Sequence, residues 1–183
     1  MALSDPGRGR PLRRVEYDKL IELGAFENER IELLDGVLVP MSPIAPPHAS
    51  AVQKLGELLI PVLLGRASVR IQNPFAALEI SEPEPDVVVA PRSDYDTAHP
   101  ADAHLIIEVS ESSLKQDRGI KRRIYAECGV PEYWVVNLVE HRIEVHTDPA
   151  LGAYRSVVLY ERGQSIRLQF FPDVEIRVLD VIK

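Results

Sequence analysis

Two acidic side chains stand among aliphatic residues, where an uncompensated charge is costly. Asp86 follows Pro85 at the start of the aliphatic run 87–89, and Glu108 follows the aliphatic run 105–107. A buried carboxylate has to be paired, protonated or bound to a metal, because burying it alone costs several kcal/mol. The separation of 22 residues fits two neighbouring strands joined by a polar segment, which would bring both acids to one metal ion. A ligand set made only of oxygen favours Mg²⁺ or Mn²⁺ over zinc.

Lys121 is the third candidate, 13 residues after Glu108. It lies on a predicted helix that Ser112 or Ser113 can cap and that ends near Glu127. An ammonium near two carboxylates would hold a water nucleophile or neutralise charge on a phosphoryl group during transfer. The alternative is that Lys121 is a solvated lysine on the helix surface.

The same helix carries a basic run in an otherwise acidic chain: Lys115, Arg118, Lys121, Arg122 and Arg123. This run is either a solvated helix face or a track that contacts phosphates. His48 opens another predicted helix, where it would either contact substrate or make a structural hydrogen bond. Tyr125, Tyr133 and Trp134 are expected to pack in the core.

The composition limits the possible function classes. The 183 residues include 28 Asp and Glu against 21 Lys and Arg, a net charge of −7, which argues against binding nucleic acid through bulk positive charge but leaves room for a local basic track. The single cysteine, Cys128, excludes an internal disulfide framework and a cysteine-based zinc site. No apolar run reaches the ~18 residues of a membrane helix, and residues 1–14 have no apolar centre typical of a signal peptide. We therefore expect a cytoplasmic protein.

The elements that would position these residues begin with a mobile basic arm over residues 1–14, followed by a single domain over 15–183. A short helix is expected over residues 15–26. Asp35 and Gly36 separate two apolar runs and predict a hairpin over 31–39, because both tolerate the positive φ of a type I′ turn. A helix over residues 48–64 has an apolar stripe, and Pro61 should kink it or end it early.

The rest of the chain is typical of a mixed α/β sheet with helices packed on it. The runs 86–89 and 105–109 have the continuous aliphatic pattern of central strands that are buried on both faces. Residues 133–138 and 143–147 are expected to form a hairpin. Further short strands are predicted over 69–71, 75–80, 154–160, 165–170 and 175–181.

Several short segments, in this order, resemble a known family. They are Glu32-Leu33-Leu34-Asp35-Gly36, Met41-Ser42-Pro43 with His48, Pro85-Asp86-Val87, Ile107-Glu108-Val109-Ser110, then Asp117, Lys121, Tyr125 and Gly129-Val130-Pro131-Glu132-Tyr133-Trp134. Over residues 15–147 the chain is similar to the Uma-type endonucleases, a former bacterial domain of unknown function. That family belongs to the PD-(D/E)xK restriction-endonuclease-like superfamily, which implies a central mixed β-sheet flanked by helices.

The resemblance also implies roles for individual residues. Asp86 and Glu108 become metal ligands, the backbone carbonyl of Val109 a further ligand, and Glu32 an upstream acid that completes the site. The superfamily's usual lysine position, two residues after the glutamate, is occupied by Ser110. In the Uma-type branch the lysine lies on the following helix, and Lys121 matches that relocated position.

These considerations predict an endonuclease that hydrolyses DNA with Mg²⁺, or Mn²⁺ as substitute, through Asp86, Glu108, Lys121 and Glu32. His48, Lys115, Arg118 and Arg122 are candidate substrate contacts. An alternative is a non-catalytic module that keeps the nuclease fold and binds nucleic acid or protein. A hydrolase of smaller phosphate esters is a third hypothesis. Because exposed sheet edges favour symmetric pairing, we also expect a homodimer.

Overall fold

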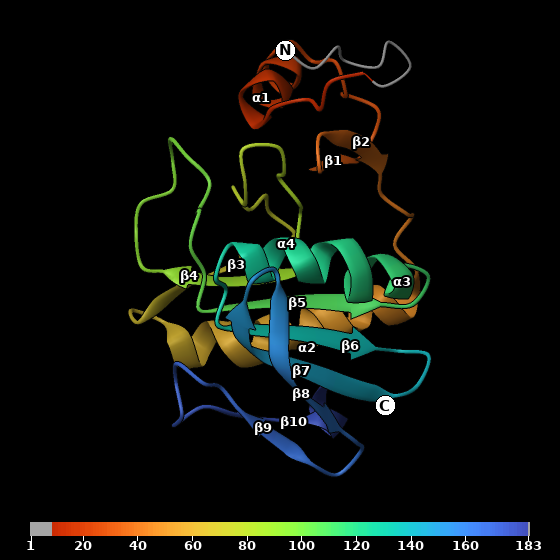
Figure 1. Cartoon of the computed structure of the whole chain (residues 1–183). Helices are drawn as coiled ribbons and strands as arrows, with labels where there is room; N and C mark the ends of the chain where they lie inside the picture. Colours follow the sequence, from red (N-terminus) through yellow and green to blue (C-terminus); the bar gives the residue numbers. More distant parts are fainter. Residues whose placement is uncertain (1–8, 183) are drawn as a thin grey trace.

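The computed structural model describes residues 9–182. At its N-terminal end, helix α1 (Arg14–Glu22) precedes an antiparallel hairpin of β1 (Ile31–Leu34) and β2 (Val37–Pro40). Asp35 and Gly36 connect the two strands with φ values of 50° and 74°, as the expected type I′ turn requires. The predicted hairpin is therefore confirmed, and Figure 1 shows it beside α1, away from the main sheet.

Six strands form the central sheet, in the order β3-β4-β5-β6-β7-β8 (Figure 1). Their bounds are β3 (Ala67–Ile71), β4 (Val87–Pro91), β5 (Leu105–Ser110), β6 (Glu132–Asn137), β7 (Arg142–Ala150) and β8 (Ala153–Tyr160). Every neighbouring pair is antiparallel except β5 and β6, which are parallel. A parallel pair needs a crossover connection, and the helical segment between these two strands provides it.

Helices cover both faces of this sheet. Helix α2 (Pro46–Leu63) packs on β3, β4 and β5, and Pro61 lies only two residues before its end. On the other side, the crossover consists of α3 (Leu114–Gln116), a π-helical turn η1 (Asp117–Lys121) and α4 (Arg122–Glu127). The helix predicted after Ser113 is thus present, with a π-helical turn in its middle.

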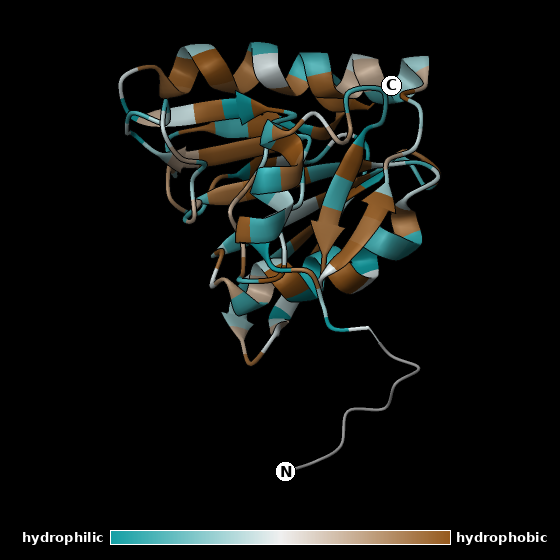
Figure 2. Ribbon diagram, turned by 90° about the horizontal axis from the view of Figure 1, so that it is seen from above, coloured by the Kyte–Doolittle hydropathy of each residue, from teal (hydrophilic) through white to brown (hydrophobic). Residues whose placement is uncertain are grey.

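Strand alternation divides the core into two clusters. Val87, Val89 and Ile107 pack toward α2, whereas Val88 and Ile106 pack toward α4, because successive side chains on a strand point to opposite faces. Both β4 and β5 are almost completely buried, as predicted for central strands, and Figure 2 shows the hydrophobic colour concentrated along the strands of the sheet. The same alternation directs Glu108 to the α4 face.

Three expectations about local structure are wrong. Residues 75–80 form no strand and make only an isolated bridge between Leu78 and Ser81, because the N–H groups of Phe75 and Ala76 bond to proline carbonyls outside any ladder. Residues 175–181 form a short strand, β10 (Glu175–Arg177), followed by helix α5 (Val178–Val181). Strand β10 pairs with β9 (Ser165–Arg167) in a separate two-stranded sheet, so the strand predicted over 165–170 is shorter than expected.

The arm expected over residues 1–14 lies partly outside the described residues, which begin at Gly9. The part that the structure describes is attached to the domain: Leu12 donates a hydrogen bond to the Gly36 carbonyl, and Arg14 donates one to the Glu79 carbonyl. Residues 10–14 therefore do not behave as a free arm. Within residues 9–182, no helix has the length and apolar character that crossing a bilayer would require.

Candidate functional site

Asp86 and Glu108 come together as their spacing predicts. Strands β4 and β5 pair antiparallel with Val87 opposite Ile107, so one step further in this register Asp86 stands opposite Glu108. Directly opposed residues of an antiparallel pair point to the same face and lie in contact range. The two side chains are buried, with 7% and 3% of their residue surface exposed.

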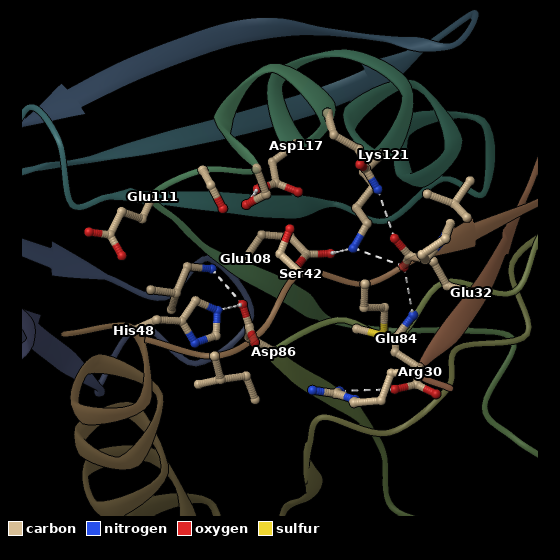
Figure 3. A pocket seen from close by; sticks show the side chains of 18 of the residues that line it. Arg30, Glu32, Ser42, His48, Glu84, Asp86, Glu108, Glu111, Asp117 and Lys121 are labelled. Carbon is tan, nitrogen blue, oxygen red and sulfur yellow. Dashed lines mark hydrogen bonds and ion pairs between the residues drawn. The ribbon is translucent and has the colours of Figure 1, made fainter. Parts of the chain in front are cut away.

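Lys121 reaches the same place from the crossover helix. Its Nζ atom lies 3.1 Å from Glu108 Oε1 and 3.0 Å from Glu32 Oε2, and the residue is only 4% exposed. Figure 3 shows its side chain descending between these two acids. The alternative of a solvated surface lysine is therefore wrong.

Glu32 is brought in from strand β1 of the N-terminal hairpin. Its Oε1 atom accepts a hydrogen bond from the Gln116 side chain at 2.8 Å. Its Oε2 atom accepts one from the Glu84 backbone N–H at 3.2 Å, in addition to the Lys121 ion pair. Both oxygens of Glu32 are thus engaged, which suits it to holding the lysine.

Asp86 is fixed by three donors. Its Oδ2 atom accepts the Val109 backbone N–H at 2.8 Å and lies 3.1 Å from His48 Nε2, and its Oδ1 atom accepts the Gln72 side-chain amide at 3.1 Å. Gln72 has a φ of 50°, an unusual backbone conformation for a residue other than glycine. The contact between His48 and Asp86 is the structural hydrogen bond considered for this histidine, and His48 also lines the pocket.

Burial and charge together set the protonation of the buried pair. Burial raises the pKa of the Glu108 carboxyl well above its ordinary value, and the Lys121 ammonium offsets this only in part. Burial lowers the pKa of Lys121, but the neighbouring carboxylates Glu108 and Glu32 outweigh that effect and leave the lysine pKa above its ordinary value. The two acids therefore favour the charged form of Lys121.

These groups form the floor of a pocket of about 670 Å³ (Figure 3). Its walls are the β1–β2 hairpin, the loop 41–45 and the start of the crossover helix, and exposed Lys115 also lines it. Arg118 and Arg122 do not line the pocket. The guanidinium of Arg118 is instead paired with Glu144 and Glu140. Contact of Arg118 and Arg122 with substrate stays a prediction.

Some pocket residues were not predicted from the sequence as site residues. Arg30 forms an ion pair with Glu84 at the pocket. Gln72 donates a hydrogen bond to Asp86, and Gln116 donates one to Glu32. Tyr125 is in the core as expected, yet its hydroxyl also donates to Glu108 Oε1 at 2.6 Å. Its spacing of four residues from Lys121, which places both on one helix face, was the signal that could have revealed this contact.

A metal ion would find carboxylate oxygens at this floor. Both hydrogen bonds to Glu108, from Lys121 and Tyr125, go to Oε1, so Oε2 has no side-chain donor within the described residues. Across residues 9–182, no three His, Cys, Asp or Glu side chains are grouped closely enough to hold a metal by themselves. The residues fit a cation that takes two carboxylates and completes its shell with water and backbone oxygen, as Mg²⁺ usually does.

A family model named Uma2, with the description "Putative restriction endonuclease", matches residues 14–181 of this chain. No curated protein is significantly similar to it in sequence. Among solved structures, that of "a putative nuclease belonging to DUF820" from Anabaena variabilis superposes with a TM-score of 0.71 at 15% identity, covering 93% of this chain and 97% of the other. The family resemblance and the fold class inferred from the sequence are confirmed, and the family supports a nuclease function.

Proposed function

The chain belongs to the Uma2 family, and we propose that it is a divalent-metal-dependent endonuclease that hydrolyses phosphodiester bonds in DNA. The observation that carries this proposal is that Asp86, Glu108 and the Lys121 ammonium meet at the floor of one pocket. Phosphodiester hydrolysis needs oxygen ligands for a cation and positive charge fixed near the same point.

Asp86 and Glu108 would hold Mg²⁺, or Mn²⁺ in its place, with the Val109 carbonyl as a further oxygen donor. The bound ion would polarise the scissile phosphate and make a water molecule more nucleophilic. Glu32 would orient Lys121, because its Oε2 atom lies 3.0 Å from the Lys121 ammonium.

Lys121 acts in this proposal as a charged donor and not as a base. It forms ion pairs with Glu32 and Glu108, and an ammonium held in this way has no free electron pair with which to take a proton from water. The ammonium would instead neutralise charge that develops on the phosphoryl oxygens. Glu32 and Glu108 supply the two contacts that fix its position.

Lys115, His48 and Arg30 line the pocket and are the groups in place to contact the DNA backbone. The proposal includes a cytoplasmic homodimer. Its support is the free edge of the sheet at β8, where Val157, Val158 and Leu159 are exposed and unpaired strand edges favour association. Light scattering of the purified protein tests the dimer independently of activity.

The metal site is tested by calorimetric titration of Mn²⁺ and Mg²⁺ into the wild type, Asp86→Asn and Glu108→Gln. Glu111→Gln is the matched control, because Glu111 is an exposed acid that lines the same pocket. We expect saturable binding by the wild type and the control, and none by the other two variants. Binding that survives in both Asp86→Asn and Glu108→Gln would show that the ion is held elsewhere.

Activity is tested with the same four proteins on plasmid, linear duplex and single-stranded DNA, with and without EDTA. We expect metal-dependent internal cleavage that both site variants lose and the control keeps. Hydrolysis of a bis-nitrophenyl phosphate ester without cleavage of DNA would favour a hydrolase of small esters. DNA binding with neither metal binding nor cleavage would favour the non-catalytic module.

A further inference from the structure

Asp117 is a buried carboxylate of the crossover helix that the proposed mechanism leaves without a role. It is 1% exposed, and its Oδ2 atom accepts hydrogen bonds from the Ser110 hydroxyl at 2.7 Å and the Ser113 hydroxyl at 2.6 Å. Its Oδ1 atom is buried and has no partner among the described residues. Ser110 is the last residue of β5, so these bonds connect the helix directly to the strand that carries Glu108.

The π-helical turn begins at this same residue. Arg122 donates its backbone N–H to the Asp117 carbonyl, five residues earlier, and the Tyr133 hydroxyl donates to that carbonyl at 3.0 Å. Residues 117, 121 and 125 follow one another at intervals of four. In an α-helix each such step overshoots a full turn by about 40°, whereas the wider π turn reduces the overshoot.

The π turn spans only the step from Asp117 to Lys121, and Tyr125 follows four residues later in α4, so the three residues share one line of the helix. Lys121 and Tyr125 both contact Glu108 Oε1, which needs both side chains on this line. We propose that Asp117, held by Ser110 and Ser113, anchors the π turn and thereby positions the Lys121 ammonium. The functional part of this inference rests on the proposed nuclease activity, whereas the positioning of the lysine does not.

The position of the lysine is measured first, without any activity assay. In ¹⁵N-lysine-labelled, metal-free protein, the buried Lys121 ammonium should give a resonance whose protons exchange slowly with water. We expect exchange to become at least about tenfold faster in Asp117→Ala and in Ser110→Ala/Ser113→Ala, the factor that corresponds to losing a hydrogen bond to a charged group. Asp117→Asn keeps an acceptor oxygen and should lie in between, and Ser112→Ala, at an exposed neighbouring serine, should match the wild type.

Kinetics then separates positioning from general disruption. In Asp117→Ala and in Ser110→Ala/Ser113→Ala, the anchor variants, we expect kcat to fall by about 100-fold, the effect of displacing a catalytic group by about 1 Å. The KM for DNA and the affinity for Mn²⁺ should stay within about twofold of the wild type, well below the tenfold change that 1.4 kcal/mol would produce. Wild-type ammonium exchange in both Asp117→Ala and the double serine variant would overturn the proposal. Loss of Mn²⁺ affinity in parallel with kcat would also overturn it, because the anchor would then support the whole site.

The two proposals fail in different ways. If the wild type cleaves no DNA, the proposed function fails, and the ammonium exchange still decides whether Asp117 positions Lys121. If the wild type cleaves DNA and the ammonium exchange is insensitive to the anchor, only the positioning role fails. Should Asp117→Ala not fold, the serine variants and Asp117→Asn give the same comparison.

Discussion

Replacing Lys121 by methionine removes the only cation that contacts both Glu32 and Glu108 among the described residues. The three side chains are 4%, 2% and 3% exposed, and the two ion pairs measure 3.0 and 3.1 Å. Methionine has a similar length and no charge, so the packing contribution to the change in stability should be small. The variant therefore reports mainly on the loss of the buried charge.

The expected magnitude follows from the burial of the two acids. Removing one partner of a buried ion pair costs about 3–5 kcal/mol. Burial already raises the pKa of Glu108, so this carboxyl can take up a proton and relieve part of the cost. We therefore expect a loss of about 3 kcal/mol at pH 7, which for a chain of this size lowers Tm by about 6–12 °C.

The pH dependence has a definite sign. Without the ammonium, the folded-state pKa of Glu108 rises further above its unfolded value, so the folded state binds a proton that the unfolded state has lost. Stability then falls as pH rises above the unfolded pKa, and the deficit of Lys121→Met should be larger at pH 9 than at pH 6. Adding Glu108→Gln should recover part of the loss at high pH, because it removes the carboxylate that lost its partner.

Urea unfolding followed by circular dichroism at pH 6 and pH 9 measures these differences. Lys115→Met is the matched control, since Lys115 is an exposed lysine of the same crossover helix and should change stability by less than about 0.5 kcal/mol. If Lys121→Met unfolds at the same urea concentration as this control at both pH values, the buried ion pairs of Lys121 with Glu32 and Glu108 do not stabilise the fold.

Three further predictions concern stability away from the pocket floor. Burial, with Asp18 nearby, raises the pKa of Glu82 to about 7, so the contribution of Glu82 to folding stability falls as pH rises from 4.5 to 7. In urea unfolding over this pH range, the free energy of unfolding of Glu82→Gln should therefore rise by about 2–3 kcal/mol relative to that of the wild type. Burial lowers the pKa of His146 to about 4, so the wild type loses stability as pH falls from 6.5 to 4. His146→Leu should therefore gain a similar free energy of unfolding relative to the wild type as pH falls over this range. For either variant, a stability difference from the wild type that does not change with pH would contradict the shifted pKa. Gly36→Ala places a Cβ within 2.6 Å of Pro11 Cα at a φ of 74° and should cost about 3 kcal/mol, measurable as a lower urea midpoint.

Local chemistry explains which elements the sequence predicts well. The Asp35–Gly36 turn and the aliphatic runs of β4 and β5 are determined by neighbouring residues, and all three are correct. The strand predicted over residues 75–80 fails because that segment satisfies its N–H groups with distant proline carbonyls. No short-range pattern reports such a partner.

The same distinction applies to the site. Asp86 and Glu108 are visible in the sequence because each is a charge among aliphatic residues. In the sequence, Arg118 is as plausible a cation for the site as Lys121, because both lie on the same helix. In the folded chain, however, Arg118 forms ion pairs with Glu144 and Glu140. The π turn could not be predicted from the sequence either, because five residues of π-helix have no residue pattern that separates them from an α-helix.

The position of the Lys121 ammonium follows from the topology of the sheet. Strands β5 and β6 are parallel, so the chain must leave the end of β5, two residues after Glu108, and return along a crossover helix on one face. Strand alternation has already placed Glu108 on that face, toward α4. The first turns of the crossover are therefore the nearest helical positions from which a long cationic side chain can reach the two acids. A lysine on this helix reaches the acids only if the pitch and the rotation of the helix are fixed relative to β5. The hydrogen bonds from Ser110 and Ser113 to Asp117 fix the helix to the end of this strand.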